Sequence, residues 1–133
     1  MPDDRQLLRV APYFPVADVE RAVVHYERVF GFRREYVAGQ EFAIVSRDGQ
    51  PVMFRRVADP SLINPNERQG GTWDAFFWVH DARALHAELS GRGADTVYGP
   101  LVQESYDMLE FAVRDPAGYV LGFGEALNGR RVG

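Results

Sequence analysis

The sequence predicts an α+β fold made of two similar βαβββ modules. Three observations lead to this prediction. Val16-Ala17-Asp18 opens an apolar stretch with helical spacing, and Val79-His80-Asp81 opens a second one later in the chain. One strand-like run precedes each helical stretch and three follow it. Residues 58–71 are rich in Pro, Asn and Gly and separate the two halves.

The first half begins with a strand-like run at residues 10–16, whose two prolines favour the edge of a sheet. Asp18 is placed to cap the following helix, because a short carboxylate can accept the free N–H groups of a first helical turn. Gly31 is predicted to end this helix. Strands at residues 33–37, 42–46 and 52–57 are expected to follow, with a tight turn at residues 47–49 between the last two.

The second half repeats this order. Residues 72–79 form an aromatic-rich strand-like run, and Asp81 is placed to cap a helix that ends near Gly91 and Gly93. Strands are expected at residues 95–98, 108–113 and 119–123, with a turn at residues 114–118. Residues 98–106 are expected to form a loop before the strand at 108–113. The two sheets should lie side by side, each with a helix on one face.

Length and composition indicate one soluble globular domain over residues 1–133, with modules at about 7–57 and 72–126 and the connector at 58–71. No apolar run reaches the about 18 residues of a membrane helix, and the N-terminus lacks the apolar core of a signal peptide. We therefore expect no membrane partner and a cytoplasmic location. The net charge of −4 argues against nucleic acid. The absence of cysteine excludes disulfides and thiol nucleophiles. Only three histidines are present as nitrogen ligands or as bases near neutral pH.

Four segments, at residues 10–22, 25–32, 78–81 and 114–121, occur in a specific order and spacing. In this order they resemble the vicinal-oxygen-chelate superfamily, which includes glyoxalases, extradiol dioxygenases and bleomycin-resistance proteins. The resemblance covers about residues 7–126 and is strongest to the bleomycin-resistance branch. It implies paired, curved mixed sheets with a concave cleft. It also implies a homodimer with ligand pockets at the subunit interface.

Metal-dependent members of that superfamily take His, Glu or Gln ligands from the first and last strand of each module. Carried over by spacing, these positions fall at Ala11, Asp74 and Gly122, and near Met53. Alanine and glycine carry no donor atom, and a methionine thioether suits none of the hard or borderline metals. Only Asp74 could act as a ligand, and none of the histidines falls at such a position. We therefore expect no metal and no cofactor.

Side chains alternate along strands, so the sequence predicts which residues lie on the faces of the sheets that carry no helix. Trp73 and Phe77 are expected beneath the second helix. Gly122 should leave open room, and Tyr106 is a candidate lid. Aromatic rings stack on flat ligands and attract cations. The candidate ligand-binding residues are Tyr13, Arg55, Asp74, Phe76, Trp78, Tyr106, Glu110 and Gly122.

These observations predict a metal-independent protein that binds and sequesters a small aromatic or cationic molecule, as bleomycin-resistance proteins do. One alternative is a metal-dependent lyase, isomerase or oxidoreductase of the glyoxalase or dioxygenase type. Another is a metal-free enzyme in which Asp74 or Glu110 is a general base. A third is a regulatory or structural dimer whose cleft is filled by Phe76 and Trp78. The sequence leaves the question of catalysis open.

Overall fold

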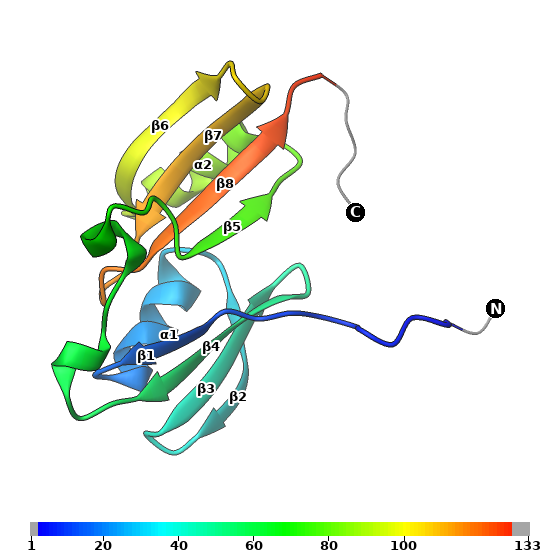
Figure 1. Cartoon of the computed structure of the whole chain (residues 1–133). Helices are drawn as coiled ribbons and strands as arrows, with labels where there is room; N and C mark the ends of the chain where they lie inside the picture. The colour runs from blue at the N-terminus through cyan, green and yellow to red at the C-terminus, as the bar shows by residue number, and fades with distance from the viewer. Residues whose placement is uncertain (1–2, 129–133) are drawn as a thin grey trace.

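The computed structural model describes residues 3–128 and confirms the two βαβββ modules (Figure 1). Residues 1–2 and 129–133 of the expected domain lie outside this range. The first module consists of β1 (Tyr13–Val16), α1 (Val19–Arg28), β2 (Arg33–Ala38), β3 (Phe42–Arg47) and β4 (Gln50–Arg56). The connector holds two 3-10 helices, η1 (Pro60–Leu62) and η2 (Asn66–Gln69). The second module consists of β5 (Ala75–Trp78), α2 (Ala82–Gly91), β6 (Asp95–Gln103), β7 (Met108–Arg114) and β8 (Val120–Ala126).

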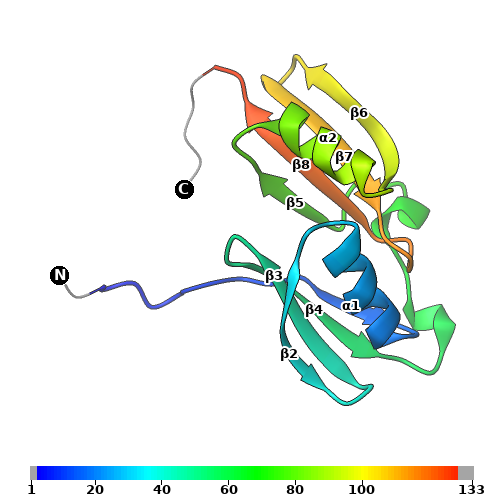
Figure 2. The same cartoon turned by 180° about the vertical axis from the view of Figure 1, so that it is seen from behind.

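The two sheets have the same strand arrangement, β1-β4-β3-β2 in one and β5-β8-β7-β6 in the other. In each, the first and last strands of the module pair in parallel and the other neighbours are antiparallel. Both helices lie on the same side of the molecule (Figure 2), so the helix-free faces of both sheets lie on the other side (Figure 1). None of the helices within residues 3–128 is long and apolar enough to cross a lipid bilayer.

Both predicted helix caps are confirmed. The Asp18 Oδ1 atom accepts a hydrogen bond of 3.0 Å from the backbone N–H of Arg21, and Asp81 Oδ1 accepts one of 3.0 Å from Ala84. These bonds satisfy N–H groups that have no partner within the helix, and they fix where each helix starts. Helix α1 ends at Arg28, and Gly31, which was predicted to end it, follows three residues later with a positive φ of 74°.

The prediction of a loop over residues 98–106 was wrong. Strand β6 continues to Gln103, and its pairing with β7 shifts register twice between Thr96 and Leu101. These irregularities accommodate Gly99 and the proline after it. Gly99 has a φ of 85°, and a Cβ atom there would collide with the Glu110 carbonyl oxygen. Only residues 104–107 form the turn between β6 and β7.

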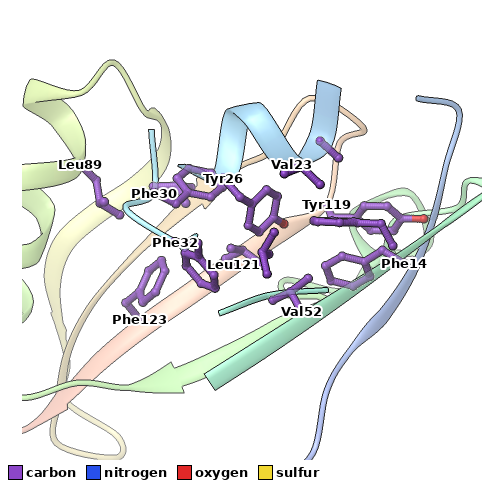
Figure 3. Packing of buried hydrophobic residues seen from close by; sticks show 14 of the residues in the cluster. Phe14, Val23, Tyr26, Phe30, Phe32, Val52, Leu89, Tyr119, Leu121 and Phe123 are labelled. Carbon is purple, nitrogen blue, oxygen red and sulfur yellow. The ribbon is translucent and has the colours of Figure 1, made fainter. Parts of the chain in front are cut away.

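One hydrophobic core runs through both modules (Figure 3). At the contact between them, the rings of Phe14 and Tyr119 stack with centroids 4.2 Å apart. The Tyr119 hydroxyl donates a hydrogen bond of 2.6 Å to the carbonyl oxygen of Pro15. Beneath α2, the ring of Phe123 stacks on those of Phe77 and Phe111. The two modules therefore share buried side chains and behave as one packed body.

A charged cluster joins the modules near the C-terminal ends of the helices. The Arg47 guanidinium lies 2.8 Å from the Glu88 carboxylate of α2 and donates to the carbonyl oxygen of Phe30 at 2.9 Å. Arg92 binds the same carboxylate at 3.0 Å and donates to the carbonyl oxygen of Arg28 at 3.3 Å. These bonds satisfy carbonyl groups near the end of α1 while they tie α2 to the first module.

A buried hydrogen bond completes the contact between the modules. The Tyr26 hydroxyl of α1 donates to Asp115 Oδ2 at 2.8 Å. Asp115 Oδ1 accepts the backbone N–H groups of Ala117 and Tyr119, each at 2.9 Å. Asp115 is only 5% exposed, and burial raises its pKa to about 6 although these hydrogen bonds oppose the rise.

The raised pKa of Asp115 predicts that mild acid stabilises the fold. Because the folded pKa of about 6 lies above the usual aspartate value of 3.8, the folded state binds this proton more tightly than the unfolded state does. The stability contributed by the proton is therefore present at low pH and is lost as pH rises through about 6. Between pH 7.5 and pH 5, the expected gain in unfolding free energy from this residue is about 1 kcal/mol.

Urea denaturation at both pH values measures this gain, with Asp115→Asn as the comparison. The amide keeps an acceptor for the two N–H groups but does not titrate. Other groups that titrate in this range act in both proteins, so the difference between the two proteins isolates Asp115. Equal pH dependence in the wild type and the variant would contradict the prediction.

Candidate functional site

The helix-free face of the second sheet is identified by the strand register. Phe77 and Phe123 stack on the helix side, so their strand neighbours point to the other face. Phe76 pairs with Gly122 across β5 and β8, and Glu110 pairs with Gly124 across β7 and β8. The structure thus places Phe76, Trp78 and Glu110 on the face that the sequence predicted.

A row of aromatic rings covers this face. The ring centroids of Trp73 and Phe76 lie 4.6 Å apart, and those of Phe76 and Trp78 lie 5.3 Å apart. The Trp73 indole N–H donates to the Tyr98 hydroxyl at 2.8 Å, so the row continues onto β6. Trp78, at the other end, is 58% exposed. The row therefore has the exposed ring of Trp78 at one end and the hydrogen-bonded pair of Trp73 and Tyr98 at the other.

The expectation that Trp73 packs beneath α2 was wrong. Strand β5 begins only at Ala75, so the alternation of side chains does not extend back to Trp73. The backbone before β5 turns the indole onto the helix-free face, where it lies against Gly122. Tyr98, its partner, was not among the predicted site residues because the sequence placed it at the start of a loop.

The prediction that Gly122 leaves open room was also wrong. A Cβ atom at this position would lie 2.6 Å from Trp73 Cδ1 and 2.8 Å from Phe76 Cδ2. A Cβ atom on Gly124 would lie 2.6 Å from Phe76 Cζ. The two glycines make space for rings of the same chain, and that space is already filled.

Asp74 does not lie with the other predicted site residues. Its Oδ1 atom accepts the backbone N–H of Asn66 at 2.9 Å, and its Oδ2 atom accepts that of Val120 at 2.8 Å. These bonds attach the connector to the start of β8. Both carboxylate oxygens accept backbone N–H groups, which argues against the predicted roles of Asp74 in ligand binding and base catalysis.

Glu110 is fully buried and accepts two tyrosine hydroxyls. The hydroxyls of Tyr98 and Tyr106 each donate to Glu110 Oε1 at 2.9 Å. Glu110 Oε2 is also buried but has no hydrogen-bond partner among residues 3–128. Burial, followed by the nearby carboxylate, raises the pKa of the Tyr106 hydroxyl, and burial and Glu110 likewise raise that of Tyr98. The two tyrosines therefore stay protonated and remain donors to Glu110.

The helix-free face of the first sheet carries a second aromatic group. The ring of Phe42 lies 6.3 Å from Tyr13 and 6.2 Å from Tyr36, between centroids. The Arg55 guanidinium carbon lies 5.9 Å from the Tyr13 ring centroid, within cation–π range. The structure therefore brings Tyr13 and Arg55 together as predicted. Tyr36 and Phe42 were missed, although alternation along their strands places them on the same face as Tyr13.

The four positions carried over from metal-dependent relatives do not fit a metal ion. Ala11 and Gly122 have no donor atom, Met53 offers a thioether, and the oxygens of Asp74 are occupied by backbone N–H groups. Within residues 3–128, no three His, Asp or Glu side chains gather in a way that could hold a metal. His86 is packed under the sheet, with Nε2 3.1 Å from Ser90 Oγ and 3.3 Å from Thr96 Oγ1.

A groove with a volume of about 750 Å³ lies between the modules along β5. Pro12 and Pro51 from the first module and Phe76 and Trp78 from the second are among its lining residues. The N-terminal arm, residues 3–12, passes this region and projects away from the body of the molecule (Figures 1 and 2). Three apolar side chains of the arm are almost fully exposed: Leu7 at 90%, Leu8 at 77% and Val10 at 86%.

The sequence profile of the Glyoxalase/Bleomycin resistance protein/Dioxygenase superfamily matches residues 6–123. The chain belongs to this superfamily. The match spans both modules and the connector, in agreement with the fold. A search of curated proteins found no match.

Solved structures of the superfamily resemble the chain over nearly its whole length. TioX from Micromonospora sp. ML1 is 26% identical with a TM-score of 0.70, and the match covers 90% of this chain and 99% of TioX. A bleomycin-binding protein from bleomycin-producing Streptomyces verticillus, complexed with copper(II)-bleomycin, is 25% identical with a TM-score of 0.64. That match covers 93% of this chain and 98% of the other. A glyoxalase-related enzyme from Clostridium phytofermentans shares the fold, with 14% identity and a TM-score of 0.67. This match covers 95% of this chain and 100% of the other.

The packing over Gly122 predicts that Gly122→Ala destabilises the protein by about 1–3 kcal/mol, because its methyl group overlaps two rings. Gly91→Ala is the matched control, since a Cβ atom at this helical position meets no atom within 4 Å. The control should be neutral or slightly stabilising. Urea denaturation followed by tryptophan fluorescence measures both. Equal stability of the two variants would show that Trp73 and Phe76 do not occupy the space over Gly122.

Proposed function

We propose that this protein binds and sequesters a small aromatic or cationic molecule without a metal ion. The observation that carries the proposal is the pair of aromatic helix-free faces, one on each sheet. Large aromatic side chains on these faces remain exposed in the single chain: Tyr13 at 54%, Tyr36 at 55% and Trp78 at 58%. Exposed aromatic groups of this kind are typical of surfaces that cover a ligand or a partner.

The Glu110 carboxylate on the second face agrees with a ligand that is flat, cationic or both, whereas Arg55 on the first face is itself a cation. Arg55 stands over the Tyr13 ring, and the Glu110 carboxylate lies under the aromatic residues of the second sheet. The bleomycin-binding protein described above supports a binding function, since it was solved with its ligand and is 25% identical. A metal-dependent reaction finds no support in the donor atoms of this chain. The proposed ligand-binding residues are Tyr13, Tyr36, Phe42, Arg55, Phe76, Trp78, Tyr106 and Glu110.

The proposal includes a homodimer. In the single chain, both aromatic faces are open surfaces that a second copy could cover. The leucines of the N-terminal arm are largely exposed, and the groove along the outer strand β5 has a mostly apolar lining. An arm of one subunit that binds in the groove of the other would bury both surfaces. The same exchange would hold the aromatic faces of two subunits opposite each other.

Calorimetry with copper(II)-bleomycin and with the flat cation ethidium tests the binding function. We expect the wild type to bind at least one of them. Trp78→Ala should weaken this binding about tenfold, because a stacked ring and its buried area are lost. Leu62→Ala is the control, since Leu62 is 52% exposed in the connector. Absence of binding would contradict the proposal, as would a stoichiometric divalent metal in protein purified without chelator.

Analytical ultracentrifugation tests the dimer. We expect a dimer in the wild type, and Leu8→Asp should raise its dissociation constant about 100-fold, because a carboxylate is costly in an apolar groove. Leu62→Asp introduces the same charge outside the groove and should leave the dimer intact. A monomeric wild type, or equal effects of the two substitutions, would show that the arm does not join two subunits.

A further inference from the structure

The Glu110 carboxylate has one buried oxygen that no group of residues 3–128 satisfies. Oε1 accepts two tyrosine hydroxyls, whereas Oε2 has no partner. Within that part of the chain, no arginine or histidine forms an ion pair with Glu110, although the structure contains many ion pairs elsewhere. A buried carboxylate that lacks both a cation and a partner for one oxygen is unfavourable. A structural role alone would not require the charge, because a glutamine could accept the same hydroxyls.

Glu110 is connected to the aromatic row of this face through Tyr98. The chain of contacts runs from Glu110 to Tyr98, from Tyr98 to the Trp73 indole, and along the aromatic row to the exposed Trp78. Rings along this row offer stacking surface, and the register places Glu110 across Gly124 from Trp78. A ligand with a flat ring and a positive group could use both.

Tyr106 contacts Glu110 from the surface. It stands on the turn of residues 104–107, is 42% exposed, and its hydroxyl donates to Glu110 Oε1 at 2.9 Å. Tyr98 is held from both sides, since its hydroxyl donates to Glu110 and accepts from Trp73. Movement of the Tyr106 side chain would therefore break one hydrogen bond of its hydroxyl, whereas movement of Tyr98 would break two.

We propose that Glu110 recognises a cationic N–H group of the ligand, such as an amidinium, a guanidinium or a protonated amine, through its free Oε2 atom. This inference rests on the proposed binding function and specifies the chemistry of the ligand. The cation supplies the donor and the positive charge that the carboxylate lacks. A hydrogen bond between two charged groups is stronger than one between neutral groups, so this contact selects for N–H cations over neutral rings of the same shape.

Three small probes separate stacking from recognition of the N–H cation. The probes are 2-naphthamidinium, which is a cation with N–H donors, 2-naphthamide, which is its neutral counterpart, and N-methylquinolinium, which is a cation without N–H groups. Calorimetry should show that the wild type binds the amidinium at least about tenfold more tightly than either other probe.

Glu110→Gln should remove this preference while the binding of 2-naphthamide stays within about twofold of the wild-type value. The variant keeps an oxygen that accepts both tyrosine hydroxyls and loses only the charge and the free oxygen. Glu104→Gln is the matched control, because Glu104 is an exposed carboxylate on the same turn. It should retain the full preference for the amidinium.

Equal binding of all three probes to the wild type would overturn the assignment of Glu110 and leave the proposed binding function intact. Retention of the amidinium preference by Glu110→Gln, or its loss in Glu104→Gln, would also overturn it. Absence of binding by every probe would overturn the assignment together with aromatic binding at this face. Thermal unfolding of each variant checks its fold. If Glu110→Gln does not fold, the comparison of the three probes on the wild type decides the question.

Discussion

The buried hydrogen bond between Tyr26 and Asp115 fixes how the two modules lie against each other, and both helix-free faces depend on it. Tyr26 comes from α1 of the first module, and Asp115 stands at the turn that leads into β8 of the second. The same carboxylate organises that turn through two backbone N–H groups. Stacking of Phe14 on Tyr119 then closes the core around this bond.

The helix-free face of the second sheet combines two glycines with large aromatic neighbours. Gly122 and Gly124 on β8 remove side chains that would otherwise occupy the helix-free face. Trp73 and Phe76 pack into the space over these glycines, so the face presents rings where a metal centre would present oxygen and nitrogen donors. This packing supports the proposed binding function.

The sequence predicted the secondary structure well where a local signal was strong. Asp18 and Asp81 cap their helices as expected, because capping involves only neighbouring residues. The prediction was wrong at β6, where two register shifts carry a strand through Gly99 and its following proline. Local sequence marks such a dipeptide as a turn, and only pairing with β7 keeps it in the sheet.

The sequence by itself determined the two repeated modules, the caps of both helices and the lack of oxygen or nitrogen side-chain donors at Ala11, Met53 and Gly122. It also placed Tyr13, Arg55, Phe76 and Trp78 on helix-free faces, because period-two alternation holds within regular strands. Only the tertiary structure decided the contacts of side chains that lie outside regular strands or that depend on neighbouring segments.

Asp74 binds the backbone of the connector and of β8, and Trp73 turns onto the helix-free face. Glu110 becomes buried under two tyrosines, one of them from a turn. Each of these outcomes depends on hydrogen bonds whose geometry follows from the register of neighbouring strands and the path of the loops. A linear pattern of residue types carries no information about that geometry.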